Sequence, residues 1–270
     1  MNKRTAAFAF VLFAALVCDS SHAAPQRPNI LLILADDLGW SDLGCYGGEI
    51  KTPHLDRLAA GGLRFTQFYN CTRCCPSRAA LLTGLYPHQA GIGAMTADQG
   101  QPGYRGSLQP NCVTIAQVLK SAGYKTAMTG KWHVGDNLSP IDRGFGDFYG
   151  WTRGYAVNSW YPRMMIRLPA GRPQRSYPPG EFFATDAITD HALDFLAEMR
   201  RGDSPWLMYV AYQAPHFPLH TRDEEIFQSF GRYRAGWEKL REERLDTAAS
   251  ESAAAYKGRL LTYRRAVSSS

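Results

Sequence analysis

The chain has 270 residues, of which 45% are hydrophobic and 20% charged, so it has the apolar content of a globular protein and is not a disordered tail. Its formal net charge of +6 suits an anionic substrate, and would equally suit nucleic acid or a bacterial surface. Much of the positive charge lies in residues 232–244 and 257–265, where a solvated helical face explains it better than nucleic-acid binding.

The first 23 residues have the features of an export signal. Lys3 and Arg4 precede an apolar run over residues 6–17, and small residues suited to cleavage follow at 21–23. The apolar run is too short to cross a bilayer. We therefore expect a signal peptide at 1–23, a secreted or periplasmic location, and no stable membrane span.

Export would leave five cysteines in the mature chain, which is an odd number in a compartment that permits disulfide bonds. They are Cys45, Cys71, Cys74, Cys75 and Cys112. At least one of them should therefore lie outside any disulfide. It is either a stray free thiol or a residue kept for chemistry, and the count alone leaves both readings open.

Residues 29–35 form a continuous apolar run, which is typical of a strand buried on both faces of a parallel sheet. Asp36 and Asp37 then fall at its carboxyl end, where open α/β sheets place their ligands. A helix is expected over 52–60, with a proline in its first turn and glycines after it. A second strand is expected over 63–69.

Helices and strands continue to alternate further along the chain. We expect helices over 77–82, 114–122 and 185–199, strands over 125–128 and 206–211, and an irregular, pocket-lining insertion over 145–179. The alternation predicts an α/β fold with a mostly parallel central sheet flanked by helices. Residues 24–245 are expected to form one domain, and 246–270 a weakly structured tail without core periodicity.

The segment 74–78 reads Cys-Cys-Pro-Ser-Arg, and Leu-Thr-Gly follows at 82–84. Pro76 fits the first turn of a helix, whose unpaired backbone N–H groups and positive dipole end favour an anion beside Cys74. Arg78 adds a fixed planar cation. The alternative is that Cys74 and Cys75 are ordinary core or disulfide cysteines.

Three other places carry residues suited to chemistry. Adjacent carboxylates at Asp36 and Asp37 repel each other and need a positive partner, and all-oxygen ligation suits Ca²⁺, although a helix cap with a solvated turn would also fit. Lys131 and His133 follow the strand expected over 125–128, where taken alone they would more often be surface residues. His216 follows the last expected strand, and a histidine can donate a proton near neutral pH.

Together these segments resemble the sulfatase family, with the pattern of the arylsulfatases, over residues 27–244. The resemblance implies an alkaline-phosphatase-like fold and a formylglycine made from Cys74 by a maturation enzyme. It also implies that the aspartate pair and residue 74 bind one calcium ion. Lys131 would bind the sulfate, His133 would polarise the nucleophilic diol, and His216 would bind and protonate the leaving alcohol or phenol.

A hydrated formylglycine suits sulfate transfer, because one hydroxyl attacks sulfur while the second later loses its proton and expels sulfate. The resemblance ends near residue 244, where the family's later Asp-Asn calcium ligands, second sulfate-binding lysine and C-terminal subdomain have no counterpart. A gene fragment, a frameshifted tail or a natural short form would each explain this.

The expected function is hydrolysis of a small-molecule or glycan sulfate ester. Two alternatives stay open: a truncated homologue that only binds anions, and a related metal-dependent phosphatase or phosphodiesterase.

Overall fold

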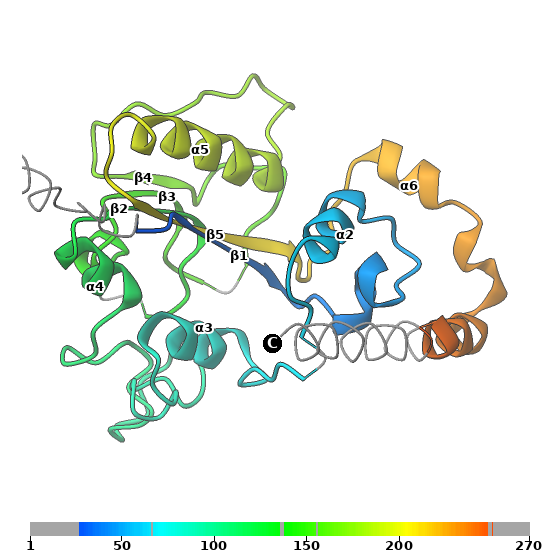
Figure 1. Cartoon of the computed structure of the whole chain (residues 1–270), viewed down its shortest axis with the longest axis horizontal. Coiled ribbons are helices and arrows are strands. Elements are labelled where there is room, and N and C mark those ends of the chain that lie inside the picture. The colour runs from blue at the N-terminus through cyan, green and yellow to red at the C-terminus, as the bar shows by residue number, and fades with distance from the viewer. Residues whose placement is uncertain (1–26, 66, 136–137, 155, 248–249, 251–270) are drawn as a thin grey trace, which may run out of the picture.

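A computed structural model describes residues 27–65, 67–135, 138–154, 156–247 and 250 (Figure 1). The signal peptide expected at 1–23 lies outside these residues, as does most of the tail expected at 246–270. Within the described ranges, no helix is both long enough and apolar enough to cross a membrane.

In the part of the chain that the structure describes, the centre of the fold is a five-stranded sheet with the strand order β1-β5-β2-β3-β4. The strands are β1 (Ile30–Asp36), β2 (Lys125–Lys131), β3 (Asp147–Trp151), β4 (Ile166–Leu168) and β5 (Trp206–Pro215). The first four in that order pair in parallel, and β4 pairs with β3 antiparallel. The α/β fold with a mostly parallel sheet is therefore confirmed, and the carboxyl ends of β1, β5 and β2 meet at one edge.

Helices cover both faces of this sheet. They are α2 (Pro53–Ala60), α3 (Cys74–Thr83), α4 (Ile115–Ser121), α5 (Ala184–Met199) and α6 (Asp223–Ser229), with 3-10 turns at Trp40–Asp42, Gly44–Tyr46, Ile141–Arg143 and Arg232–Ala235. Figure 1 shows α5 on one face and α3 and α4 on the other, while α2 and α6 lie past the carboxyl ends of β1 and β5. The first turn of α3 therefore lies on the face of the sheet opposite α5.

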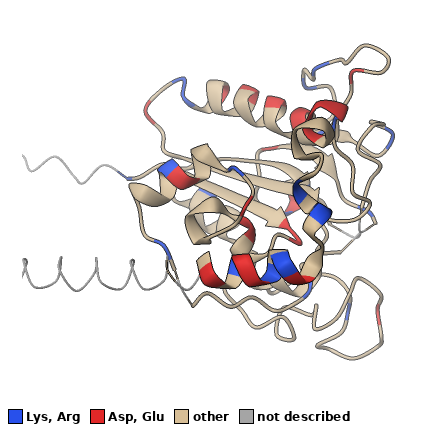
Figure 2. Cartoon of the chain, turned by 90° about the vertical axis from the view of Figure 1, so that its right-hand side faces the viewer, with Lys and Arg blue, Asp and Glu red and all other residues tan. Residues whose placement is uncertain are grey.

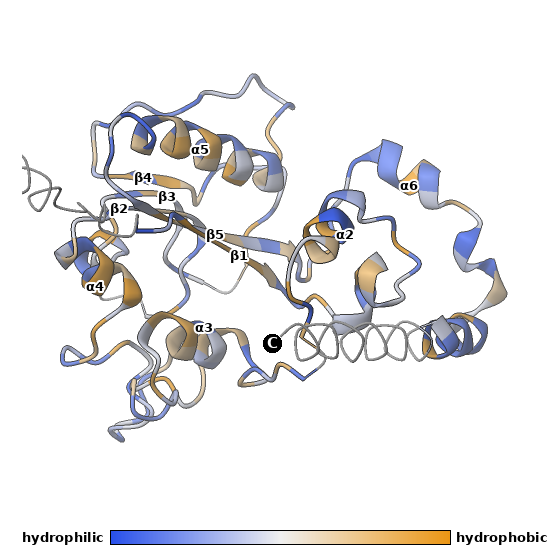
Figure 3. Ribbon diagram, viewed as in Figure 1, coloured by the Kyte–Doolittle hydropathy of each residue, from blue (hydrophilic) through white to orange (hydrophobic). Residues whose placement is uncertain are grey.

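The helix α5 forms because its apolar residues recur at helical spacing. Its buried residues include Ala184, Ile188, Phe195 and Met199, which all fall on one side of the helix. Figure 3 shows this apolar side turned toward the sheet and the polar side turned away. The packing of α5 on the sheet thus stabilises one of the two faces.

Two hydrophobic cores lie on the two faces of the sheet. Phe148 and Tyr209 belong to the core shared with α3, whereas their neighbours Tyr149 and Met208 belong to the core shared with α5. This alternation follows because successive residues of a strand point to opposite faces.

A further helix spans residues 237–247. Figure 2 shows its acidic and basic residues interspersed, so the positive charge of this region does not form a single basic patch. Arg244 on this helix contacts Glu49 at 2.5 Å and Asp42 at 2.7 Å. The ion pairs attach the helix to the loop that follows β1.

The strand expected over 63–69 is wrong, because its described residues belong to no strand or helix. Leu63, Phe68 and Tyr69 are exposed rather than packed on a sheet. A strand needs a hydrogen-bonded neighbour, and the apolar pattern of this segment does not supply one.

The insertion expected to be irregular over 145–179 instead contributes β3 and β4. The strand β3 runs parallel to β2, with Ala127 opposite Asp147 and Lys131 opposite Trp151. Trp151 is buried in the core against α5. Aromatic residues that suggested a pocket lining therefore belong in part to the sheet and its core.

The strand β1 is present as expected, but it is not buried on both faces. It lies at the edge of the sheet, and Leu31 and Ile33 on one of its faces are 50% and 49% exposed. The continuous apolar run thus identified the strand correctly, whereas the expected burial of both its faces is wrong.

Candidate active site

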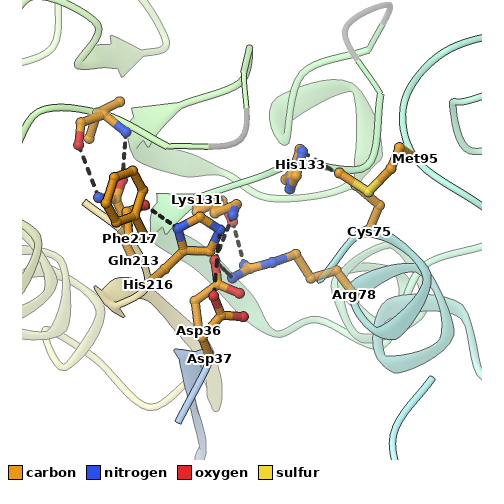
Figure 4. Close-up of polar contacts among 11 residues, drawn as sticks. Asp36, Asp37, Cys75, Arg78, Met95, Lys131, His133, Gln213, His216 and Phe217 are labelled. Carbon is orange, nitrogen blue, oxygen red and sulfur yellow. Dashed lines mark hydrogen bonds and ion pairs between the residues drawn. The ribbon is translucent and has the colours of Figure 1, made fainter. Parts of the chain in front are cut away.

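The candidate site lies where β1, β5 and β2 end and α3 begins (Figure 4). Because parallel strands end at the same edge, Asp36 from β1 and Lys131 from β2 meet there although β5 separates their strands. His216 follows the end of β5 and faces Asp37. The first turn of α3 approaches the same edge and contributes Cys74.

Cys74 is the first residue of α3, which begins three residues earlier than expected. The preceding Arg73 has an extended backbone, and the helix ends at Thr83 before Gly84 in the left-handed conformation. The thiol of Cys74 therefore lies at the positive end of a ten-residue helix. The prediction that Pro76 belongs to the first turn of this helix is confirmed.

The neighbours of Cys74 favour its thiolate. The pKa of Cys74 is lowered to about 3, first because Cys75 hydrogen-bonds to it, and further because of a hydrogen bond with His133 and the charge of Lys131. The pKa of Cys75 is raised, since it donates to Cys74 and is buried. None of the five described cysteines forms a disulfide with another. Cys74 is thus the cysteine whose surroundings suit chemistry.

Arg78 connects α3 to the two strands. Its guanidinium is buried, with Nη1 donating to the backbone oxygen of Lys131 at 2.8 Å and Nη2 lying 3.5 Å from Oδ2 of Asp36. Its Nε and Nη2 have no hydrogen-bond partner among the described residues. Arg78 therefore has donors left to bind an anion, while it also holds the end of β2 in place.

Lys131 is fully buried and its ammonium donates to Oδ2 of Asp36 at 2.6 Å. A buried ammonium needs a partner, and Asp36 at the neighbouring strand end supplies it. The residue before it must be glycine: at Gly130, where φ is +95°, an added Cβ would lie only 1.9 Å from the oxygen of Ala211. The sequence predicted Lys131 as a sulfate ligand, and the structure places it against an expected metal ligand.

Asp37 and His216 face each other at the outer side of the site. Oδ2 of Asp37 lies 3.7 Å from Nε2 of His216, whose Nδ1 donates to the backbone oxygen of Phe217. The sheet register explains the meeting, because Asp36 pairs with Pro215. The Asp37 side chain is 61% exposed, so this side of the site is open to solvent.

Two non-glycine residues of the site have left-handed backbone conformations, Asp37 with φ +62° and His133 with φ +52°. Such conformations are sparsely populated outside glycine, and they tend to gather where function constrains the backbone. His133 is buried, and its Nδ1 has no hydrogen-bond partner among the described residues. Both residues are therefore held in position by the surrounding structure.

The residues present fit part of a calcium site. Asp36 and Asp37 offer adjacent carboxylates, which are suitable ligands for a hard cation. Ca²⁺ takes roughly six to eight oxygen ligands, so these two residues would supply only part of its coordination shell. Asp36 already balances the charges of Lys131 and Arg78. A calcium ion would therefore share Asp36 with these cations and bind Asp37 from its open side.

Sequence reasoning missed two residues beside the nucleophile candidate. Sγ of Cys75 lies 3.3 Å from Nε2 of His133 and 3.8 Å from Sδ of Met95. The pair of adjacent cysteines was a signal that could have identified Cys75, whereas nothing local indicated Met95. His220, four residues after His216, accepts a hydrogen bond from the backbone N–H of Ser159 at 3.3 Å.

The fold and the site define an α/β protein whose ligand-binding edge combines a reactive cysteine, buried cations and paired carboxylates. The chain belongs to the sulfatase family, whose profile matches residues 28–267. It is 33% identical over 265 residues to an arylsulfatase of Klebsiella aerogenes, covering 91% of this chain and 54% of that protein. The resemblance deduced from the motifs is thereby confirmed, although the family profile continues past residue 244, where the resemblance was expected to end.

Solved structures have a similar fold. A crystal structure of Ps i-CgsB in complex with k-i-k-neocarrahexaose superposes with a TM-score of 0.67 at 29% identity, covering 83% of this chain and 52% of that one. A structure of BT4656 in complex with its substrate D-glucosamine-2-N,6-O-disulfate gives a TM-score of 0.61 at 31% identity, covering 76% and 38%. The chain spans about half the length of the curated relatives it matches.

Proposed function

We propose that this protein hydrolyses sulfate esters, with a formylglycine made from Cys74 as the nucleophile. The observation that carries the proposal is the position of Cys74 at the positive end of α3, in hydrogen-bond contact with His133 and near the charge of Lys131. Membership of the sulfatase family supports the same chemistry. A cysteine at this position speaks against the related phosphatases and phosphodiesterases, which use serine or threonine.

The chain's own residues would divide the work as follows. The N–H groups of the first turn of α3 and the free donors of Arg78 bind the sulfate oxygens. His133 holds a proton at the nucleophilic oxygen of residue 74, and Lys131 keeps the local potential positive. His216 gives a proton from Nε2 to the leaving oxygen, and Oδ2 of Asp37 lies 3.7 Å from this nitrogen.

Two groups would complete the chemistry. Converted residue 74 supplies a hydrated aldehyde that can attack sulfur and later release sulfate. Calcium, held by Asp36, Asp37 and residue 74, would neutralise sulfate charge. The substrate is a small-molecule or glycan sulfate ester, in line with the sulfated glucosamine that is the substrate of BT4656.

Partners and location belong to the same proposal. A formylglycine-generating maturation enzyme would act on the segment 74–78 before it folds into α3. The export signal at 1–23 would deliver the protein to the periplasm or outside the cell.

The test combines mass spectrometry with turnover. After expression with the maturation enzyme, the peptide containing residues 73–78 should show the mass decrease of a thiol converted to an aldehyde. The converted protein should hydrolyse an aryl sulfate, Cys74→Ala should abolish hydrolysis, and Cys112→Ala should keep it. Unconverted Cys74 after this treatment, or equal turnover by Cys74→Ala, would overturn the proposal.

A second candidate is a homologue that binds sulfate without hydrolysing it. The pairing of Asp36 with both Lys131 and Arg78 favours it, because this carboxylate already has its counter-charges. Complete conversion of Cys74 with sulfate binding and no turnover would support this candidate.

A further inference from the structure

A cluster of soft ligand atoms lies beside the proposed nucleophile. The Sγ atoms of Cys74 and Cys75 and a ring nitrogen of His133 all lie within 4.8 Å of one another. Sδ of Met95 adds a fourth such atom, 3.8 Å from Sγ of Cys75. Cys75 and His133 are buried, and Cys74 is partly exposed, which leaves one side from which an ion can enter.

The thiol of Cys75 faces more ligand atoms than it has protons to donate. Its Sγ faces Cys74, Nε2 of His133 at 3.3 Å and Sδ of Met95 at 3.8 Å, yet a thiol has a single proton to donate. That one proton is shared between Sδ of Met95, to which Sγ of Cys75 donates at 3.8 Å, and Cys74. A cation bound among these atoms would satisfy all of them at once.

Two of the distances between these atoms are close to those of tetrahedral coordination. Zinc–sulfur bonds of about 2.3 Å and zinc–nitrogen bonds of about 2.0–2.1 Å place neighbouring ligand atoms of a tetrahedron roughly 3.5–3.8 Å apart. The observed 3.3 Å from Cys75 to His133 and 3.8 Å from Cys75 to Met95 lie close to this range. Small shifts of the side chains would suffice to close the site around an ion.

We propose that the unconverted chain binds one thiophilic metal ion, with Zn²⁺ the best fit, through Cys74, Cys75, His133 and Met95. Thiolate, thioether and imidazole ligands select such ions over calcium and magnesium. Two thiolates also neutralise the charge of Zn²⁺, which allows it to bind near the cations of the active site. The ion would cap the thiol of Cys74 in chains that fold without being converted.

Neither a disulfide nor the carboxylate pair accounts for this cluster. A disulfide between Cys74 and Cys75 is disfavoured, because adjacent Cα atoms are about 3.8 Å apart, whereas disulfides usually join Cα atoms about 4.4–6.8 Å apart. Figure 4 shows Cys75, His133 and Met95 on the other side of Arg78 from Asp36 and Asp37. The soft cluster therefore shares residue 74 with the proposed calcium site but neither of its carboxylates.

The experiment is a cobalt titration of the full chain, expressed without the maturation enzyme and kept reduced and free of oxygen. Co²⁺ should bind one ion per chain and give a thiolate-to-cobalt charge-transfer band, which Zn²⁺ should then remove by displacement. Cys75→Ser should reduce the band to about half, because Cys74 is then the one thiolate left, and should weaken binding at least about 100-fold, since even partners of metal ligands cost about 10–100-fold when lost. Met95→Leu should keep the band and bind more weakly.

The matched control is Cys112→Ser, because Cys112 is also a buried thiol and lies outside the cluster. Its cobalt affinity and band should equal those of the parent, and circular dichroism should show that each variant is folded. The proposal is overturned if no thiolate band forms, if Cys75→Ser binds as tightly as the parent, or if Cys112→Ser loses the band. None of these results bears on turnover by the converted protein, so the proposed hydrolysis stands or falls separately.

Discussion

The ammonium of Lys131 lies 2.6 Å from the carboxylate of Asp36, and both side chains are buried. The pair joins the end of β2 to the end of β1 across β5, which lies between them in the sheet. Arg78 approaches the same oxygen of Asp36 at 3.5 Å, so one carboxylate balances two cations. Asp36 therefore stabilises the fold, and it can also be a ligand of any ion that binds there.

Asp36→Asn should destabilise the protein strongly. The substitution leaves Lys131 and Arg78 buried without their counter-charge, and breaking a buried ion pair in this way costs about 3–5 kcal/mol. The free energy of unfolding, measured by urea titration, should fall by that amount.

Asp37→Asn is the matched control at the neighbouring position. Its side chain is 61% exposed, so its loss should change the free energy of unfolding by no more than about 0.5 kcal/mol. Both variants should lose activity if the carboxylate pair binds calcium. Equal stability of the two variants would contradict the structural role given to Asp36.

Gly130→Ala should also destabilise the fold, for a steric reason. The new Cβ would lie 1.9 Å from the oxygen of Ala211 on β5, at a residue with φ +95°. Strand separation and backbone strain together should cost about 3 kcal/mol or more. The loss of stability should appear as a lower urea midpoint of unfolding and a lower yield of soluble protein.

Gly171→Ala provides the comparison, since this glycine has φ +80° but nothing within 4 Å of an added Cβ. Only the cost of the left-handed backbone should remain there, about 1–2 kcal/mol. If both alanine variants lose the same stability, the close approach of β2 to β5 does not explain Gly130.

Local signals in the sequence predicted much of the fold. Pro76 and Gly84 are signals for the start and end of a helix, and α3 lies between Cys74 and Thr83. The strands β3 and β4 were missed because their formation depends on pairing. Trp151, for example, is a strand residue because it lies opposite Lys131 on a strand from another part of the chain.

The sequence predicted which residues belong to the site, but not which of them contact one another. Asp36 and Lys131 were each identified, but their contact follows from a strand order that places β5 between β1 and β2. Met95 carries no motif, and it reaches Cys75 only through the path of a loop. Contacts between distant segments of this kind are set by tertiary packing and leave no local pattern.

Acid should weaken the attachment of helix 237–247. Arg244 donates to both carboxylate oxygens of Glu49 and, with Tyr233, lowers the pKa of Glu49 to about 2. Because this folded pKa lies below the ordinary value of about 4.3, the stabilisation is complete above about pH 5 and is lost as the pH falls toward 2. Glu49→Gln should be less stable than the parent at pH 7, and this difference should shrink in that range.

Thermal unfolding of the parent and Glu49→Gln at a series of pH values measures the difference. Glu242→Gln, which changes an exposed acid of the same helix, should match the parent at every pH. A stability gap for Glu49→Gln that is the same at pH 7 and pH 3 would rule out this linkage.

His216→Ala should impair hydrolysis in a way that depends on the leaving group. If Nε2 of His216 gives its proton to the departing oxygen, its loss matters most where that oxygen leaves as a basic alkoxide. The value of kcat for a sugar sulfate should fall by about 10²–10⁴-fold. An aryl sulfate with an acidic phenol needs little protonation, so its kcat should fall much less.

His220→Ala is a suitable control, since His220 accepts a hydrogen bond from the backbone of Ser159, whereas His216 is the histidine that faces Asp37. Its effect should be similar for both substrates, as expected for a residue that only shapes a loop. The contrast between substrates is therefore the decisive quantity. An equal loss for both substrates in His216→Ala would assign His216 to holding Asp37 in place rather than to proton transfer, because an ion pair acts alike on every leaving group.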